Sequence, residues 1–189
     1  GGLEFDIRGL NLELHGTCED ITERKRATDD LRDSNATLRE ALVGTVRSMA
    51  FVVECRDPYT AGHQRRVAEL AEAIAREMGF SEDRIEGIRM AAFIHDLGKI
   101  TVPAEILCKP SILKKAEFEL IQDHPRAGYD ILKDIAFPWP IARIVLEHHE
   151  KLDGSGYPDG LSGDAILPES RIVTVADVVE SMASHRPYR

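Results

Sequence analysis

Seven side chains that can bind metal ions stand among apolar residues along this 189-residue chain. Any one of them alone would indicate only a hydrogen-bonded core residue. As a set they are more informative, because burying that many ionisable groups without partners is costly. Imidazole nitrogens and carboxylate oxygens are ligands that divalent metals accept, so a shared metal centre would remove the cost. The seven are His63, His95, Asp96, His124, His148, His149 and Asp177.

Two adjacent histidines, His148 and His149, pose a geometric question, because neighbouring residues on a helix point about 100° apart. Each follows an apolar residue by one turn: His148 comes four after Ile144, and His149 comes four after Val145. Residues four apart lie on the same side of a helix. We therefore expect both imidazoles to lean inward from opposite edges of the buried face and to reach one ion from two directions.

The seven residues divide into two expected ligand sets that share Asp96. Asp96 follows His95 directly and is well placed to bridge two ions. Cysteine is absent from both sets, which argues against a structural zinc site of the thiolate type. One ion is expected to take His63, His95, Asp96 and Asp177, and the other Asp96, His124, His148 and His149.

Three further charged residues stand next to these ligands. Lys99 follows His95 by four residues and would be favoured at a helix C-terminus in any protein. Beside two ions, we expect it to hold an anionic phosphoryl oxygen. Glu147 and Glu150 flank the histidine pair and are expected to be solvated or to lie behind the ligands.

The composition limits the possible partners and the compartment. The net charge of -9, from 24 basic and 33 acidic residues, argues against a general surface for duplex nucleic acid. A small anionic ligand stays possible, because a metal or a few arginines can reverse the local field. Three separated cysteines without a CxxC pair are typical of reduced thiols, and no apolar run approaches the roughly 20 residues of a membrane span. We expect a cytoplasmic fragment of a longer protein.

Helical patterns account for nearly all of the chain after Thr60. Gly79 ends one predicted helix and Ser81 caps the next, which runs into His95 and stops at Gly98. Glycines, a proline and aspartates at 151–164 predict a loop. This part of the chain is therefore predicted to be all-α, with its remaining helices at 114–123, 125–134, 139–149 and 168–183.

The first 53 residues follow two other patterns. Residues 3–21 alternate and carry glycines, which predicts one or two strands. Residues 23–53 repeat apolar positions at spacings of four and three, which is a heptad seam and predicts a dimeric coiled coil. The alternative is a single amphipathic linker helix. The seam consists of Leu31, Asn35, Leu38, Leu42, Thr45, Met49 and Val52.

Two stretches carry a family resemblance. The sequence HDLGK at 95–99 resembles the HD superfamily of metal-dependent phosphohydrolases, and HHEKLDGSGYP at 148–158 resembles the signature of its HD-GYP subfamily. The resemblance covers about residues 45–189, and the ordered series is far more specific than an HD dipeptide. Further matches are RDPYT at 56–60, His124-Pro125, Ala176-Asp177 and RPYR at 186–189.

This resemblance implies a bacterial signal-transduction enzyme, a cyclic di-GMP phosphodiesterase that yields pGpG and, in some members, GMP. It implies an all-α HD-type bundle around two or three metals, often iron or manganese. Members with a third metal carry a glutamate where this chain has Tyr59, so we expect two divalent ions. The seven residues above match the family's ligand positions, and Asp96 and Lys99 are the expected catalytic residues. Positions matching the family's substrate contacts are Lys99, Tyr157, Arg186 and Arg189.

A second resemblance concerns the N-terminus. The sequence DITERKRA at 20–27 is similar to the exit from a PAS sensor domain. We therefore expect three parts: a PAS-like end at 1–22, a helical linker at 23–44 and a C-terminally incomplete HD-GYP domain at 45–189. A signal in the sensor would rotate or re-register the helix. A homodimer through residues 23–53 and diguanylate cyclase (GGDEF) domains are the expected protein partners.

The functional hypothesis is hydrolysis of cyclic di-GMP by a metal-bridged hydroxide, under control of the sensor. Two alternatives remain at this point. The HD core also suits another cyclic dinucleotide or nucleotide, and only a substrate panel separates these. The domain would otherwise be a metal-stabilised, non-catalytic module that docks a diguanylate cyclase domain. No ligand of the expected set is missing, which favours an enzyme.

Overall fold

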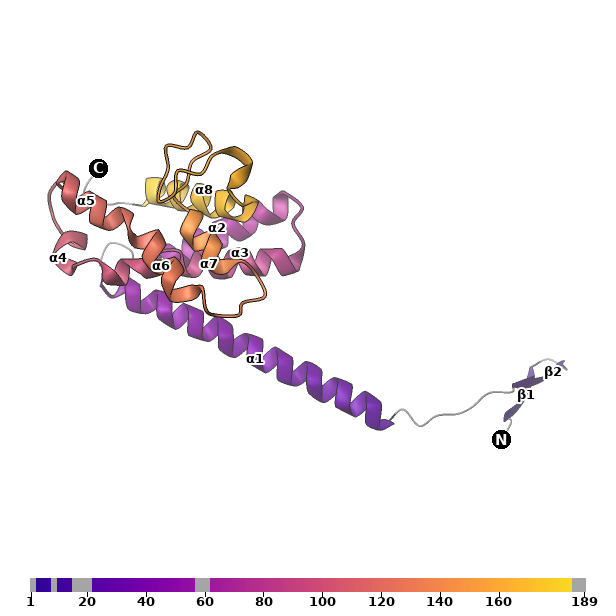
Figure 1. Ribbon diagram of the computed structural model, residues 1–189. Helices are drawn as coiled ribbons and strands as arrows, with labels where there is room; N and C mark the ends of the chain where they lie inside the picture. Colours follow the sequence, from indigo (N-terminus) through magenta and orange to yellow (C-terminus); the bar gives the residue numbers. More distant parts are fainter. Residues whose placement is uncertain (1–2, 8–9, 15–21, 57–61, 185–189) are drawn as a thin grey trace. The chain divides into compact units, whose positions relative to one another are not determined.

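The computed structural model describes residues 3–7, 10–14, 22–56 and 62–184 of the chain (Figure 1). Contacts between Cα atoms divide the chain into two units, residues 1–41 and 42–189. The helix α1, Thr22–Glu54, runs through the division.

The first unit contains an antiparallel pair of strands. These are β1, Leu3–Ile7, and β2, Leu10–Leu14, with Leu3 opposite Leu14 and Ile7 opposite Leu10. The pairing confirms the strands predicted from the alternation. The predicted PAS exit at 20–27 begins outside the described residues and stays a prediction.

The helix α1 confirms the helical pattern predicted over residues 23–53. Its last turns bury Val46, Ala50 and Val53 in the second unit. These residues follow a different stripe from the heptad seam, so seam residues such as Met49 and Val52 stay exposed. The exposed seam residues are left for a second helix, whereas the seam residue Leu42 is partly buried against the core.

The second unit is all-α, as the sequence predicted. Its longer helices begin and end within a few residues of the predicted positions, and the additional short turns were not predicted. The elements are α2, His63–Glu77; α3, Glu82–Ile94; η1, Leu97–Thr101; α4, Ala104–Leu107; α5, Lys115–Gln122; α6, His124–Leu132; α7, Ile141–Glu147; η2, Gly163–Ala165; and α8, Pro168–Ala183.

Local signals set several of these boundaries. Ser81 caps α3 by accepting a hydrogen bond from the backbone N–H of Arg84 at 3.4 Å, as expected of a serine before a helix. Gly79 follows α2 with a φ of +77°, which a glycine adopts without steric cost. Pro125 occupies the first turn of α6, where its missing N–H leaves no helical bond unmade.

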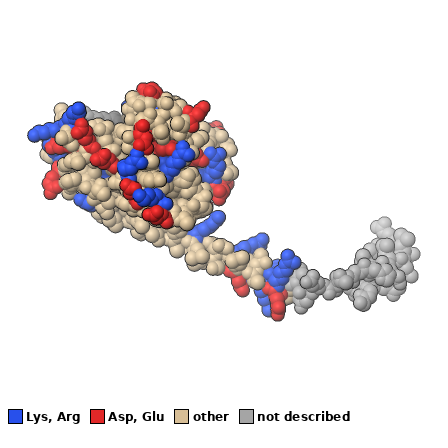
Figure 2. Space-filling model, in the orientation of Figure 1, with Lys and Arg blue, Asp and Glu red and all other residues tan. Residues whose placement is uncertain are grey.

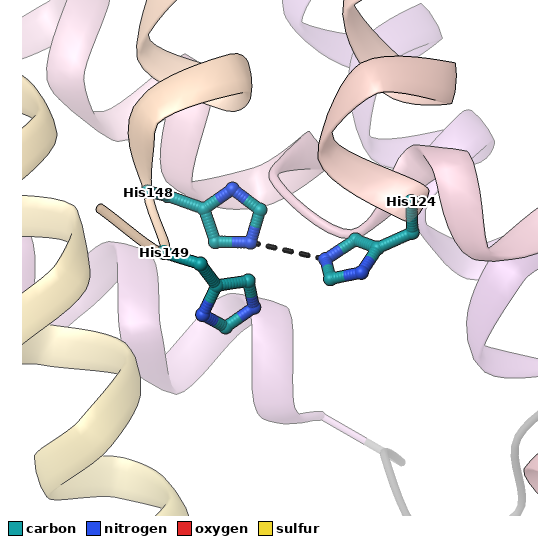
Figure 3. Close-up of side chains that lie close together, drawn as sticks. All are labelled: His124, His148 and His149. Carbon is teal, nitrogen blue, oxygen red and sulfur yellow. Dashed lines mark hydrogen bonds between the residues drawn. The ribbon is translucent and has the colours of Figure 1, made fainter. Parts of the chain in front are cut away.

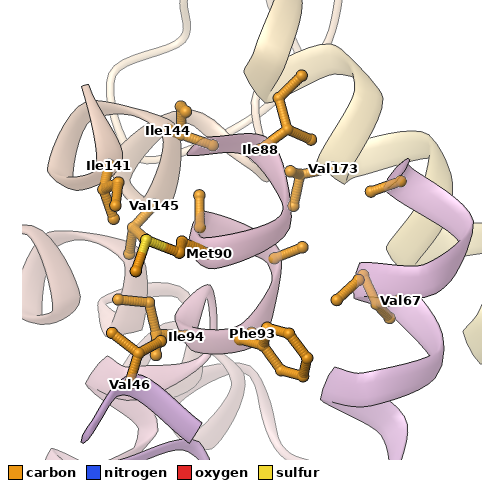
Figure 4. Packing of buried hydrophobic residues seen from close by; sticks show 14 of the residues in the cluster. Val46, Val67, Ile88, Met90, Phe93, Ile94, Ile141, Ile144, Val145 and Val173 are labelled. Atoms are coloured by element: carbon orange, nitrogen blue, oxygen red, sulfur yellow. The ribbon is translucent and has the colours of Figure 1, made fainter. Parts of the chain in front are cut away.

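The core of the second unit lies between α2, α3, α7 and α8 (Figure 4). Five of its side chains are fully buried, at 0% exposed: Val67, Ile88, Ile144, Val145 and Val173. Burying such side chains stabilises a fold by about 1.5–3 kcal/mol each. This packing fixes α2 and α8, which carry predicted metal ligands, and α3 and α7, which precede others.

One close backbone approach joins η1 to α6. A Cβ at Gly98 would lie 1.9 Å from the backbone oxygen of His124, so only a glycine fits there. This approach brings the segment that carries Asp96 and Lys99 against the start of α6. Gly98 thus acts as a packing residue between two parts of the predicted ligand set.

Charges on the surface are mixed. On the face shown in Figure 2, basic and acidic side chains lie interspersed over the second unit, with no continuous basic patch. None of the helices in the described ranges combines the length and the apolarity that crossing a bilayer requires.

Candidate metal centre

All seven predicted metal ligands come together in the second unit. They lie at the start of α2 (His63), after α3 (His95 and Asp96), at the start of α6, at the end of α7 and in the middle of α8. Six of them are buried, and His149 is partly exposed. The short segments that follow α3 and α7 therefore supply four of the seven predicted ligands.

The donor atoms form three overlapping groups, within each of which they lie within 4.8 Å of one another. Figure 3 shows one of these groups, with His124 facing the adjacent pair across a 3.2 Å contact between Nε2 of His124 and Nε2 of His148. The groups are His63, His95 and Asp177; His95, Asp96 and His148; and His124, His148 and His149.

Asp96 lies between the two expected ligand sets. Its Oδ1 is 3.3 Å from Nε2 of His124, and its Oδ2 is 3.5 Å from Nε2 of His95. The two carboxylate oxygens thus face different imidazoles. A carboxylate in this position has the geometry to bridge two ions.

Three of the histidines are held in the same way. His95, His124 and His148 each have Nδ1 at 2.6–2.8 Å from the backbone carbonyl three residues earlier. Because a carbonyl only accepts, Nδ1 must carry the proton, and the Nε2 lone pair is then directed into the cluster. This is the tautomer that a metal-binding imidazole needs.

Nε2 of His95 tests whether the site suits a metal. His95 is 0% exposed, and its Nε2 has no hydrogen-bond partner. A buried polar atom left unpaired costs about 1–3 kcal/mol. Its neighbours are imidazole nitrogens and carboxylate oxygens, the donors that divalent first-row metals accept. The donor set therefore fits a metal ion, which would pair this nitrogen.

The protonation states also suit metal binding. Burial lowers the pKa of His95, lowers that of His148 well below its usual value and brings that of His149 to about 3, so these rings are neutral near pH 7. Burial would raise the pKa of Asp96 and Asp177, but neighbouring cationic and imidazole groups outweigh it and lower both. The site therefore presents these three neutral imidazoles beside charged carboxylates.

Lys99 enters the cluster through Asp96. Its Nζ donates to Asp96 Oδ2 at 2.7 Å, and its side chain is 14% exposed. This is the carboxylate oxygen that also faces His95. The Lys99 ammonium thus places a positive charge next to the Asp96 carboxylate.

The comparisons with known proteins bear on this arrangement. Residues 47–189, most of the second unit, match the family described as HD domain. The chain belongs to the HD-domain family. The matched range includes all seven of the clustered residues, from His63 to Asp177.

Several known HD-domain relatives are similar to this chain. The cyclic di-GMP phosphodiesterase response regulator RpfG of Xanthomonas campestris pv. campestris (strain 8004) is 36% identical, over 100% of this chain and 54% of its own length. The 3'3'-cGAMP-specific phosphodiesterase 3 of Vibrio cholerae is 43% identical, over 76% of this chain and 31% of its own length. The chain thus spans about half or less of these relatives.

A solved structure shows the same fold. The HD domain of the L. monocytogenes phosphodiesterase PgpH, in complex with cyclic-di-AMP, superposes with a TM-score of 0.56 at 25% identity. The superposition covers 74% of this chain and 75% of that chain. It agrees with the all-α architecture of the second unit.

The loop after α7 forms one wall of the HD-domain cluster. The Tyr157 ring stacks on His149 with centroids 4.8 Å apart and an interplanar angle of 30°. The Tyr157 backbone N–H also donates to the carbonyl of His149 at 3.2 Å. The loop turns back closely, because a Cβ at Gly156 would lie 2.4 Å from the backbone nitrogen of Lys151. Tyr157 therefore lies directly beside the ligand set.

The two flanking glutamates were expected to be solvated or to lie behind the ligands. Glu147 and Glu150 are 1% and 3% exposed, so the solvated alternative is excluded. Glu147 accepts from the backbone of Leu167 and the hydroxyl of Ser170, each at 2.8 Å. Glu150 accepts from the backbone N–H groups of two loop residues, Asp159 and Leu161, at 2.7 and 2.9 Å. Both glutamates hold the loop and the start of α8 beside the cluster.

The histidine pair also differs from its predicted setting. α7 ends at Glu147, so His148 is its C-cap and His149 lies beyond it, although a helix to residue 149 was predicted. The reason is a tight turn in which the N–H of Glu150 donates to the carbonyl of Glu147 at 2.8 Å. This turn, rather than helical spacing alone, brings both imidazoles to the cluster.

Glu180 is a residue of the site that the sequence analysis missed. It is 6% exposed and its carboxylate contacts Nδ1 of His63, the side chain of Arg66 and the hydroxyl of Ser184. Burial would raise the pKa of Glu180, but these hydrogen bonds lower it to about 2. A signal was present, since Glu180 follows Asp177 by three residues on α8. The predicted contacts Arg186 and Arg189, and also Tyr59, lie outside the described residues.

Proposed function

We propose that this chain is a metal-dependent phosphodiesterase that hydrolyses cyclic di-GMP to the linear dinucleotide pGpG, and in part to GMP. The observation that carries the proposal is the cluster of seven ligand side chains, six of them buried, in which Nε2 of His95 has no hydrogen-bond partner. Family membership agrees, because HD-domain phosphohydrolases are metal-dependent. The similar protein from Xanthomonas campestris is itself named a cyclic di-GMP phosphodiesterase.

Two divalent ions, iron or manganese, are the proposed cofactors. The two oxygens of Asp96 face different imidazoles, those of His95 and His124, which supports a division of the ligands into two sets that share this carboxylate. When bound, such ions lower the pKa of water and neutralise charge on phosphoryl oxygens. His63, His95, Asp96 and Asp177 would hold one ion, and Asp96, His124, His148 and His149 the other.

The residues around the ligands have proposed roles of their own. Lys99 lies 2.7 Å from Asp96 and is the nearest cation to the cluster among the contacts described above. If a metal ion held Asp96, the ammonium of Lys99 would be free to hold a phosphoryl oxygen of the substrate. Tyr157, stacked on His149, offers its other ring face to a guanine, because bases stack on the faces of aromatic side chains. Arg186 and Arg189 are proposed to bind phosphate.

Substitution of Asp96 tests the proposal. Asp96→Ala removes the carboxylate shared by both ligand sets, so we expect loss of bound metal and loss of cyclic di-GMP turnover. Asp134→Ala is the control, because Asp134 is an exposed aspartate outside the cluster. Metal content of anaerobically purified protein is measured by elemental analysis and turnover by chromatography. Full turnover by the Asp96 variant would refute the proposal.

A second candidate substrate has a specific observation in its favour. The similar phosphodiesterase from Vibrio cholerae is named for 3'3'-cGAMP, and it is 43% identical to this chain over 76% of its length. The cluster acts on the phosphodiester and not on the base, so it serves either messenger. A panel of cyclic di-GMP, 3'3'-cGAMP and cyclic di-AMP separates the candidates by kcat/KM.

The proposed setting of the enzyme is a cytoplasmic signalling protein. Its partners are proposed to be a second copy of the chain, joined through residues 23–53, and diguanylate cyclase domains. Exposure of the seam supports the dimer, since Leu31 and Leu38 are 63% and 65% exposed. A PAS-like sensor domain, of which residues 1–22 are proposed to be the C-terminal end, would act through the linker at 23–44 on the phosphodiesterase at 45–189.

A further inference from the structure

The first ligand histidine is held differently from the others. His95, His124 and His148 each place Nδ1 against a backbone carbonyl of their own segment. His63 instead places Nδ1 against the carboxylate of Glu180, which is 117 residues away along the chain. His63 is therefore oriented by another helix and by a full negative charge.

The contact belongs to a paired arrangement of two helices. α2 packs against α8, with His63 and Arg66 three residues apart on α2 and Asp177 and Glu180 three residues apart on α8. Residues at this spacing lie on the same side of a helix. Three contacts therefore join the facing pairs: His63 contacts both carboxylates, and Arg66 contacts Glu180.

The two nitrogens of His63 have different partners. Nε2 lies 3.1 Å from Oδ1 of Asp177, inside the ligand cluster, whereas Nδ1 contacts Glu180. The nitrogens lie on different edges of the imidazole, so Glu180 stands behind the ring and Asp177 in front of it. Glu180 is thus placed to fix the ring and its tautomer, and not to bind the same ion.

Glu180 is itself firmly held. Nε of Arg66 donates to its Oε1 at 2.6 Å, and the hydroxyl of Ser184 donates to the same oxygen. The other oxygen, Oε2, remains directed at His63. With the carboxylate 6% exposed and held at one oxygen, its position toward the imidazole is fixed.

We propose that Glu180 is a positioning residue that orients His63 for metal binding and strengthens it as a ligand. A carboxylate behind a ligand imidazole fixes its tautomer and raises its basicity, and losing such a partner typically weakens metal affinity about 10- to 100-fold. The effect should fall on the ion bound by His63, His95 and Asp177 and leave the other ion in place. The inference rests on the proposed metal centre, although its test needs no substrate.

The test is a titration of the metal-free chain with Mn²⁺, with free Mn²⁺ measured by electron paramagnetic resonance. In Glu180→Gln we expect one of the two binding steps to weaken about 10- to 100-fold and the other to stay unchanged. Glu169→Gln is the matched control. Glu169 is also on α8, is 8% exposed and pairs with an arginine, Arg84, at 2.6 Å, but it has no hydrogen bond or ion pair with any histidine in the described part of the chain.

The outcomes separate the possible failures. Wild-type Mn²⁺ affinity in Glu180→Gln, or an equal loss in Glu169→Gln, overturns the positioning role. If the wild type binds no Mn²⁺, the proposed metal-dependent function fails instead. Ser184→Ala covers the case in which Glu180→Gln does not fold, because it removes one contact to Glu180 and leaves the rest. It should weaken the same binding step by a smaller factor, and an unchanged step would refute the inference.

Discussion

At the scale of single residues, the site depends on where each imidazole carries its proton. Hydrogen bonds to carbonyls fix Nδ1 as the donor in His95, His124 and His148. The Nε2 atoms are thereby left for metal, and in His95 that atom has no other partner. Such a cluster is prepared for ions before they bind, because neither the tautomers nor the ring orientations need to change.

Lys99 gives a prediction at this scale. Lys99→Met removes the cation that we expect to stabilise charge on the phosphoryl oxygens, so turnover should fall about 100-fold. Metal content should remain, because Lys99 is not a ligand. Both quantities are measured on the same anaerobic preparation.

The control for Lys99 is Lys133→Met. Lys133 also donates to an aspartate three residues earlier, Asp130, at 2.7 Å, but on the surface. Its turnover should equal that of the wild type. Normal turnover by Lys99→Met with full metal content would contradict the assigned role.

At the scale of elements, the loop after α7 is held to the site by Glu150. This carboxylate accepts two backbone N–H groups, those of Asp159 and Leu161. A glutamine has only one side-chain oxygen to accept with, and its amide hydrogens would face one of these donors. One buried side chain thus holds the loop that carries Tyr157 at two backbone positions.

Glu150→Gln should therefore loosen the loop. We expect a loss of stability of about 1–3 kcal/mol, because a buried donor is left unpaired, and a raised KM for cyclic di-GMP. Thermal unfolding and steady-state kinetics measure the two effects. Glu105→Gln, at an exposed position, is the control. A KM unchanged from that of the wild type would show that Glu150 does not position the loop for substrate.

The helix α1 gives a second prediction for an element. Lysines at Leu31 and Leu38, both exposed in the single chain, would place charges in the proposed dimer seam. Leu31→Lys with Leu38→Lys should shift the chain from dimer to monomer in sedimentation equilibrium. Arg32→Lys, off the seam, is the control. A wild-type chain that is monomeric at all concentrations would refute the dimer.

How far the sequence predicted the structure depends on the range of each interaction. The boundaries at Gly79 and Ser81 were predictable, because caps and glycine turns act between near neighbours. The end of α7 was not, since the turn at Glu150 belongs to a loop that packs back on the helix. The role of Glu180 was hidden for the same reason, because it depends on contact between α2 and α8.

At the scale of the whole molecule, the metal centre joins the ends or middles of several helices. Without metal, the second unit keeps imidazoles and carboxylates buried around Nε2 of His95, which has no hydrogen-bond partner. Anything that binds the folded state alone stabilises it by mass action, about 4 kcal/mol at a concentration 1,000 times its Kd. Metal and fold are therefore expected to be linked.

The metal-free protein should lose stability in acid. The pKa values of His95, His148 and His149 are lowered by burial, so below pH 6.5 the unfolded chain takes up protons that the folded chain excludes. His63 opposes them: burial lowers its pKa, but contacts that include Asp177 outweigh burial and raise it, so it adds stability below pH 6.5. The three histidines with lowered pKa values outweigh the one with a raised pKa, so the net effect of acid is a loss of stability.

Urea unfolding in the presence of a chelator measures this balance. Between pH 7.5 and 5.5 the free energy of unfolding should fall by about 3 kcal/mol. Saturating Mn²⁺ at pH 7.5 should raise it above the metal-free value. A metal-free protein that is more stable at pH 5.5 than at pH 7.5 would contradict the neutral state assigned to the buried imidazoles.

The central claim is that the buried cluster hydrolyses a cyclic dinucleotide only when it holds metal. The most direct measurement adds Mn²⁺ stepwise to the metal-free chain and follows conversion of cyclic di-GMP to pGpG at each ratio of metal to protein. We predict no conversion without metal and full activity once both ligand sets are occupied. Intact cyclic di-GMP in the presence of protein with two bound ions, or conversion by the metal-free chain, would contradict the account.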